Sequence, residues 1–338
     1  MAQDPKKITS ILLVVIVLTV GWLDYWSNSQ ASYRDPRMWM DVVEGTAHAP
    51  AQYRLGVIDT AYFLTRHTHL GLRHTLTLLD VIAAFIAVFV LFMMLRRSAV
   101  YREAGTAGQW FGAAGFVILV QFYLAWLLWY QRPETLATAA ILALALMLLT
   151  VPLGRGAGVA VIGFLILAAA QAFVRADVGF ALHLGILLVC LTPIGRGFAL
   201  SRRVQVSTSL VALLIVMGIQ FWLMRRAFPH ADYGGTKVVQ LLVNLTSPRL
   251  WMPFLLFIGP FAWTLWTVVK RRYLADPADA AMLVGAVIFS GMWLVVGLMA
   301  EVRIFMPFAL ALTPLTTQIV MQQFLPIELR GTPKSSLS

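Results

Sequence analysis

Long apolar stretches, separated by short polar segments, are the feature that most constrains how this 338-residue chain can fold. A helix needs about 20 mostly apolar residues to cross the roughly 30 Å of hydrocarbon in a bilayer. Ten stretches approximately meet that length, and each is predicted to be a membrane-spanning helix. The predicted spans are 8–23, 75–95, 108–130, 134–153, 157–174, 178–194, 206–224, 250–269, 279–299 and 304–325.

Composition supports the same fold class, because hydrophobic residues make up 60% of the chain and charged residues only 12%. A soluble domain carries about 25% charged residues, which cover its water-exposed surface. We therefore predict an all-α, polytopic integral membrane protein in a single transmembrane domain (1–338). A cytosolic enzyme, a disordered chain and a disulfide scaffold are excluded. The single cysteine, Cys190, lies in an apolar run and is expected to be a core residue.

Basic residues cluster in short segments beside the predicted spans, as at Arg96-Arg97, Arg202-Arg203 and Lys270-Arg271-Arg272. The positive-inside rule then favours an orientation with both termini in the cytoplasm. Anionic lipids, rather than nucleic acid, are the expected counter-charge for the net charge of +11. The segments expected outside are 24–74, 131–133, 175–177, 225–249 and 300–303.

The first apolar run follows two lysines, so it fits either a retained anchor or a secretory signal cleaved near Ser29-Gln30-Ala31. Trp22, Tyr25 and Trp26 resemble an interfacial aromatic belt and favour the anchor. Cleavage would remove one helix and leave the orientation of the others unchanged.

Carboxylates and histidines gather in the predicted outer segments, whereas the inner loops contain no histidine. Chemistry on the outer side has no supply of ATP, and the chain has neither a Walker-type nor a dinucleotide-binding glycine loop. No cofactor is expected. His67 and His69 diverge on a helix, so no metal site is expected there either. Asn244-Leu245-Thr246 is an acceptor pattern for glycosylation in an outer segment.

The loop 24–74 is predicted to contain an amphipathic helix that lies at the membrane surface and turns into the second span. Asp59, Arg66, Arg73 and Asp80 recur every seven residues, which places them on one stripe of a straight helix. The stripe either lines a cavity or faces water. Asp80 lies inside the span and needs a partner, for which Arg73 is nearest in sequence.

Glu301 and Arg303 occupy the short outer turn before the last predicted span. Two residues apart on a helix, their side chains would point in nearly opposite directions, so we expect each to have a different partner. Arg303 beside an apolar cavity is suited to bind a phosphate, because the guanidinium fork matches phosphate oxygens. The alternative is an arginine that only snorkels to the membrane surface.

Several short patterns are shared with one enzyme superfamily: Asp24-Tyr25 after the first span, Ala49-Pro50-Ala51-Gln52-Tyr53-Arg54 in the outer loop, and Glu301-x-Arg303-x-Phe305-x-Pro307. In these the chain resembles polytopic bacterial membrane proteins of the GT-C-type glycosyltransferases, directly over 24–80 and 300–315. Such enzymes use a sugar donor linked to a lipid phosphate, with an acid of the first outer loop as base and basic residues on the donor phosphate.

The resemblance implies a protein of the bacterial inner (plasma) membrane that performs inverting transfer of a sugar from a polyprenyl-phosphate donor on the extracytoplasmic face. Membrane lipids and protein subunits are the partners that it implies. The residues that it implies are Asp24, Asp41 and Glu44 as candidate bases, Arg54, Arg66, Arg73 and Arg303 as phosphate contacts, and Asp59, Asp80 and Glu301 as supporting ion pairs. The outer loop lacks the acidic pair of the family, which leaves catalysis open.

Two other functions fit the same topology. One is a transporter or flippase of a lipid or polar solute, and the other is a non-catalytic membrane subunit of a cell-envelope assembly complex. Coupled transport uses ionisable residues near the middle of the membrane, and apart from Asp80 and His183 the predicted spans contain few. This scarcity argues against transport coupled to protons.

Overall fold

Every regular element in the described part of the chain is helical. Of the first predicted span, 8–23, only a few positions are described, and Asp24 lies outside the described residues. The computed structural model describes 36–126, 132–150, 157–198, 200–232, 239–271, 276–299 and 301–324, with isolated positions before residue 36.

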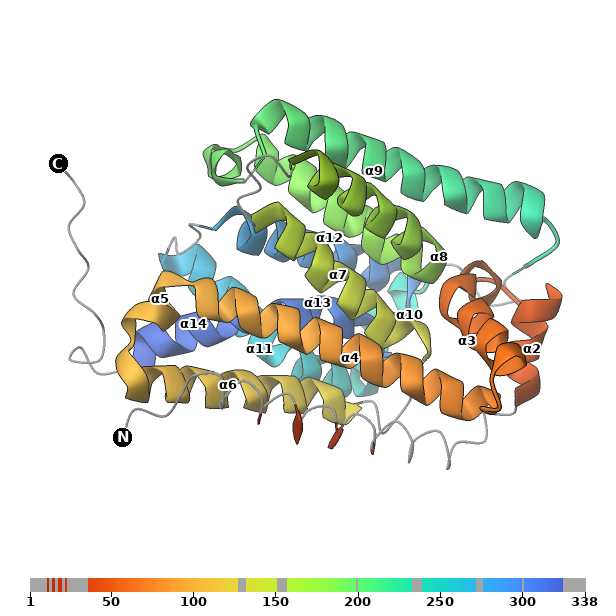
Figure 1. Cartoon of the computed structure of the whole chain (residues 1–338), viewed down its shortest axis with the longest axis horizontal. Coiled ribbons are helices and arrows are strands. Elements are labelled where there is room, and N and C mark those ends of the chain that lie inside the picture. Colours follow the sequence, from red (N-terminus) through yellow and green to blue (C-terminus); the bar gives the residue numbers. More distant parts are fainter. Residues whose placement is uncertain are drawn as a thin grey trace.

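Most of the long helices run along the longest dimension of the molecule, with α2 and α3 at one end and α5 at the other (Figure 1). The long helices are α4 (Leu72–Arg97), α6 (Gly105–Ala125), α7 (Glu134–Thr150), α8 (Ala157–Cys190), α9 (Arg202–Trp222), α11 (Trp251–Arg271) and α12 (Pro277–Val296). The shorter elements are α2 (Pro36–Glu44), η2 (Ala51–Tyr53), α3 (Leu55–His67), α5 (Ala99–Glu103), η5 (Pro193–Gly197), η6 (Leu223–Ala227), α10 (Leu241–Thr246), η7 (Pro248–Leu250), η8 (Val302–Phe305), α13 (Met306–Ala311) and α14 (Thr313–Phe324).

Six of the described helices are long and apolar enough to cross a membrane, or seven if the bent pair of α13 and α14 is one span. Their outer faces carry large apolar side chains, such as Ile118, Val159 and Leu214, which are exposed. In water such a surface would be unstable, whereas in hydrocarbon it is the expected one. These helices therefore indicate an integral membrane protein, as the composition predicts.

The 34-residue helix α8 is two antiparallel helices that meet at a kink, where Arg175 has extended backbone angles. Phe164 and His183 are nineteen positions apart in the sequence, which on a straight helix would separate them by about 28 Å. Their ring centroids are instead 5.0 Å apart. The chain therefore reverses direction at Arg175, within the turn 175–177 that the apolar pattern predicts.

The predicted last span, 304–325, is not a continuous helix, which corrects that expectation. It is divided into α13 and α14, whose axes differ by 61°. Pro307 and Pro314 lie in the first turns of these two helices, where a missing N–H is tolerated but a preceding helix cannot continue unbroken. Every residue from 302 to 317 is buried, so this segment fills the centre of the bundle and has little contact with lipid.

The loop before the second span also differs from the expectation of one helix that turns into the membrane. The helix α3 ends at His67 and α4 begins at Leu72, with Gly71 preceding it. The two helices pack against each other, and the hydroxyl of Thr65 donates to that of Thr75 over 3.2 Å. Residues spaced seven apart across this break therefore do not form one stripe.

The second half of α8 crosses α12 with the two backbones in close contact. A Cβ atom added at Gly185 would lie 2.7 Å from the carbonyl oxygen of Ala281 and 2.8 Å from the backbone nitrogen of Gly285. Two glycines at the crossing permit this approach, as small residues do between helices in membranes. The crossing holds the turn of α8 beside the end of α12, where the candidate site lies.

Candidate functional site

A cavity of about 550 Å³ lies where the turns at one end of the bundle meet. All five segments predicted to lie outside the membrane contribute to its lining, through Arg54, Arg132, Arg175, Gln240 and Arg303. The ends of α9 and α12 complete the wall. Its volume is in the range of small-molecule sites.

Charged side chains are concentrated in this cavity to a degree that is unusual for so apolar a chain. Four arginines and three carboxylates line it, which leaves an excess of one positive charge. The carboxylates belong to Glu134, Asp177 and Glu301. Each of the three accepts a hydrogen bond from an arginine, so the acids hold guanidinium groups around one space.

Arg54 and Glu134 form an ion pair between the loop 24–74 and the start of α7. The Nη1 atom of Arg54 lies 2.7 Å from Oε1 of Glu134, and the carboxylate side chain is only 8% exposed. Burial lowers the pKa of Arg54, but the nearby carboxylates of Glu134, Asp177 and Glu301 outweigh it, so its pKa is raised above the ordinary value. Arg54 therefore remains charged.

Arg175 and Asp177 are fixed in the turn of α8 by partners on other elements. Nε of Arg175 donates to Oδ1 of Asp177 over 3.1 Å, and Nη1 donates to the backbone oxygen of Ile304 over 3.3 Å. The indole N–H of Trp293, on α12, donates to Oδ2 of Asp177 over 3.0 Å. The guanidinium also lies 5.4 Å from the ring centroid of Phe289, within cation–π range.

Glu301 and Arg303 bond to each other, which corrects the expectation that each has a separate partner. Nη2 of Arg303 donates to Oε2 of Glu301 over 3.1 Å. Glu301 precedes the 3-10 helix η8 and has non-helical backbone angles. The opposite directions expected of residues two apart on an α-helix therefore do not apply here.

The remaining arginine of the cavity, Arg132, lies near an aromatic side chain of α2. Its guanidinium carbon lies 5.9 Å from the ring centroid of Trp39, a buried residue of that helix. The four arginines thus come from four separate turns and loops, and each is held by a carboxylate or an aromatic ring.

This arrangement is suited to bind an anion that carries several oxygens. Guanidinium groups donate in a planar fork that matches a phosphate, and they remain charged throughout the physiological pH range. Because the carboxylates already orient the arginines, little side-chain freedom is lost when an anion binds. The ion pairs also reduce the positive field, so a ligand must satisfy the geometry as well as the charge.

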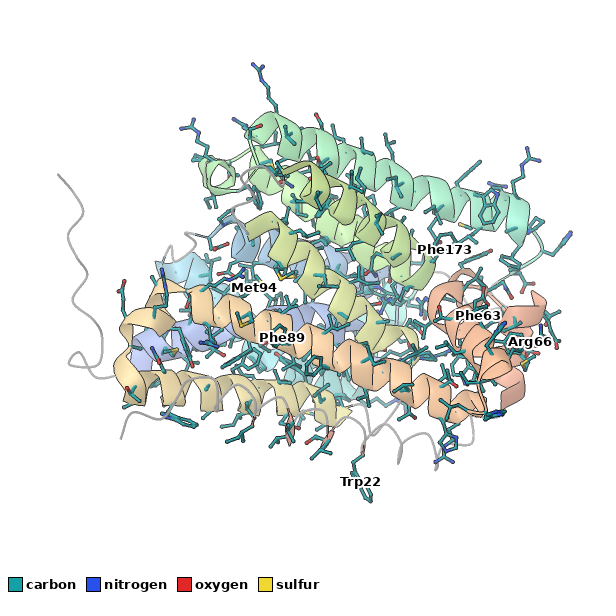
Figure 2. The ribbon with its side chains drawn as sticks, viewed as in Figure 1. Trp22, Phe63, Arg66, Phe89, Met94 and Phe173 are labelled. Atoms are coloured by element: carbon teal, nitrogen blue, oxygen red, sulfur yellow. The ribbon has the colours of Figure 1, made fainter. Side chains whose placement is uncertain are left out.

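Only some of the residues selected from the sequence reach the cavity. Arg54, Arg303 and Glu301 line it. The others do not: Asp41 and Glu44 are exposed on α2, Asp59 and Arg66 are exposed on α3, and Arg73 and Asp80 lie on α4. Arg66 and Phe63 project from α3 at the edge of the molecule, with the guanidinium of Arg66 over the ring of Tyr62 (Figure 2).

Sequence reasoning did not select four of the charged residues in the cavity, namely Arg132, Glu134, Arg175 and Asp177. A signal for them exists in the sequence. Three short outer turns each carry an arginine and an acid two residues apart, as Arg132-Pro-Glu134, Arg175-Ala-Asp177 and Glu301-Val-Arg303. Paired opposite charges at turns of an otherwise apolar chain indicate where the turns meet, because charges there need partners.

Histidines are not part of the cavity. Within the described ranges, no group of three or more His, Cys, Asp or Glu side chains lies close enough to hold a metal ion. Nδ1 of His67 is 2.8 Å from the backbone oxygen of Phe63 in its own helix.

Comparisons with protein-family models, curated proteins and solved structures found no match.

Asn244 holds one wall of the cavity in place. It is fully buried, and its Nδ2 donates to the backbone oxygens of Leu294 and Gly297 over 2.8 and 2.7 Å. Its Oδ1 accepts from the backbone N–H of Met299 over 3.1 Å. The side chain therefore satisfies three backbone groups where α12 ends, next to the cavity residues Gly297 and Leu298. An amide nitrogen used in this way is not accessible for glycosylation.

We expect Asn244→Ala to destabilise the folded protein by about 2 kcal/mol, because it leaves buried backbone groups without partners. Thr246→Ala is the matched control, since it also destroys the acceptor pattern but removes only an exposed hydroxyl that bonds within α10. Thermal unfolding in detergent measures both. Equal losses of stability in the two variants would contradict the structural role of Asn244.

Proposed function

We propose that this chain is a bacterial inner-membrane protein that binds the phosphate of a lipid-linked substrate in the arginine cavity, on the extracytoplasmic side. The observation that carries the proposal is the convergence of Arg54, Arg132, Arg175 and Arg303 on one space. A helical bundle gains no stability from assembling four cations at one point, because like charges repel. Three carboxylates offset most of that repulsion, and a bound anion would offset the rest.

We further propose the reaction that the sequence resemblance implies, which is transfer of a sugar from a polyprenyl-phosphate donor. A base takes the proton of the acceptor hydroxyl, its oxygen forms a bond to the anomeric carbon, and the bond from that carbon to the phosphate oxygen breaks. The phosphate leaves with the electron pair. The arginines would stabilise this leaving phosphate, since its negative charge grows in the transition state.

The carboxylates that line the cavity are the candidates for the base in this proposal. Asp41 and Glu44 lie on the exposed face of α2 and do not line it, and Asp24 lies outside the described residues. Among the three carboxylates of the cavity, Glu301 has the most exposed side chain, at 41%, and its bond to Arg303 uses only Oε2. We therefore assign the base to Glu301, which leaves Oε1 to accept a proton.

One observation favours a transporter or flippase as the second candidate. The central segment is a broken helix, α13 and α14, that begins beside the cavity residues Arg303 and Ile304. Broken helices at the centre of the membrane are typical of secondary transporters, where they form the substrate site. The two functions differ in product, because a transporter moves the lipid-linked donor without cleaving it.

We expect Arg303→Gln to weaken the binding of inorganic phosphate by about 10- to 100-fold, because one charge-assisted hydrogen bond is worth about 1.5–3 kcal/mol. Arg66→Gln makes the same change of charge on the same chain, but outside the cavity, and should have no effect. Isothermal titration calorimetry with the purified protein measures both affinities, and thermal unfolding checks that both variants fold. Unchanged binding by Arg303→Gln would refute the site.

We expect Glu301→Gln to abolish release of free polyprenyl phosphate from a polyprenyl-phosphate sugar while the phosphate still binds. Asp41→Asn, which changes an exposed acid of α2, should retain the release. Proteoliposomes that contain the donor and a mixture of acceptor sugars provide the assay, with the products separated by chromatography. Donor that crosses the bilayer intact, with no release by the wild type, would support the transporter instead.

A further inference from the structure

The cavity has a charged interior and an apolar mouth. Among the described residues that line it, the four arginines, Glu134 and Asp177 are buried or half-buried, and the side chain of Glu301 is 41% exposed. The other lining residues that are exposed are all apolar: Pro50, Met224, Val296 and Leu298. A cavity that admits a water-soluble ion is expected to show the reverse order, with polar groups at its opening.

The apolar mouth continues into the surface that the helices present to hydrocarbon. Met224 follows Phe221 and Trp222 at the end of α9, which are both exposed. Val296 follows Val295 at the end of α12, which is also exposed. The apolar lining residues at the ends of these two helices therefore adjoin the lipid-facing surface, and Arg225 and Arg226 are exposed just beyond Met224.

We propose that the mouth between the ends of α9 and α12 is the binding site for the hydrocarbon chain of the ligand, which reaches the arginine cavity laterally from the membrane. This inference rests on the proposed binding of a phosphate in the same cavity, and it adds where the lipid lies. The phosphate contacts the guanidinium groups, and the first part of the chain lies on Met224, Val296 and Leu298.

The binding free energy that the mouth can contribute to a hydrocarbon chain predicts how affinity depends on chain length. For a short prenyl phosphate that binds from water, each methylene group removed from water contributes about 0.8 kcal/mol, so a few carbon atoms against the mouth contribute more than tenfold in affinity. Carbon atoms beyond the mouth do not contact the protein and add little. Affinity should therefore rise steeply from inorganic phosphate to a short prenyl phosphate, and little from there to a long polyprenyl phosphate.

The test compares two double variants that make the same substitutions at matched positions. Met224→Gln/Val296→Thr makes the mouth polar with little change in side-chain volume. Met217→Gln/Val287→Thr makes the same changes on the same two helices, at exposed positions away from the cavity. The exposed fractions are comparable, at 42% and 44% for the mouth and 55% and 44% for the control.

Native mass spectrometry of the detergent-purified protein measures binding of inorganic phosphate, farnesyl phosphate and a polyprenyl phosphate. We expect the mouth variant to bind both prenyl phosphates about tenfold more weakly than the wild type, because apolar contact is lost. Its affinity for inorganic phosphate should be unchanged. The control variant should bind all three ligands as the wild type does.

Failure of the phosphate site and failure of the lateral hydrocarbon site would give different results. If the wild type binds none of the three ligands, the phosphate site itself is refuted. If inorganic phosphate binds in an Arg303-dependent manner but the prenyl chain adds no affinity, the lateral site is refuted and the anion site stands. Equal weakening in the mouth and control variants would show that the chain adheres to the whole apolar surface, which also refutes the lateral site.

Discussion

The cost of an unpaired charge in hydrocarbon is the constraint on which the rest of this structure depends. A chain with 12% charged residues places them in turns, and where turns meet, the charges must find partners. At one end of the bundle Glu134, Asp177 and Glu301 each hold an arginine. The pairs connect the loop 24–74 to α7, fix the turn of α8, and lie at the start of the central segment formed by α13 and α14.

The same pairs give the cavity its chemical character. Arginines held by carboxylates keep their charge and their positions, so an anion can bind without a large loss of side-chain freedom. Because each acid is bonded to a guanidinium group, the cavity is better suited to bind an anion than to abstract a proton. The proposed transfer uses Glu301 as the base, since its side chain is the most exposed of the three. In the proposed account, the apolar residues at the mouth would select, among anions, those that carry a hydrocarbon chain.

Much of the fold could be predicted from the apolar pattern. The helices α4, α6, α9, α11 and α12 overlap their predicted spans, and the turn at Arg175 falls where two apolar runs are separated by three residues. The pattern could not predict the break between α13 and α14, because apolar residues that are buried in protein look the same as those that face lipid. Only Pro307 and Pro314 indicated it.

The site was less predictable, for a physical reason. Arg54 and Glu134 are 80 positions apart, and Trp293 and Asp177 are 116 apart, so these contacts depend on how whole helices pack. The sequence indicated Arg54, Glu301 and Arg303 through their local motifs. It gave equal weight to Arg66 and Arg73, which the break between α3 and α4 directs away from the cavity.

The most direct test of the account is the side of the membrane on which the cavity end lies. Asp232 is exposed and lies 3.0 Å from Nδ1 of His48, two residues before the cavity residue Pro50. Arg102 is exposed in α5, which lies at the opposite end of the molecule from α2 and α3 (Figure 1). Intact cells that express Asp232→Cys or Arg102→Cys are treated with a membrane-impermeant maleimide, against which the buried Cys190 gives little background. Labelling of Asp232→Cys alone is the predicted result. Labelling of Arg102→Cys alone would place the arginine cavity in the cytoplasm and contradict an extracytoplasmic lipid-phosphate site.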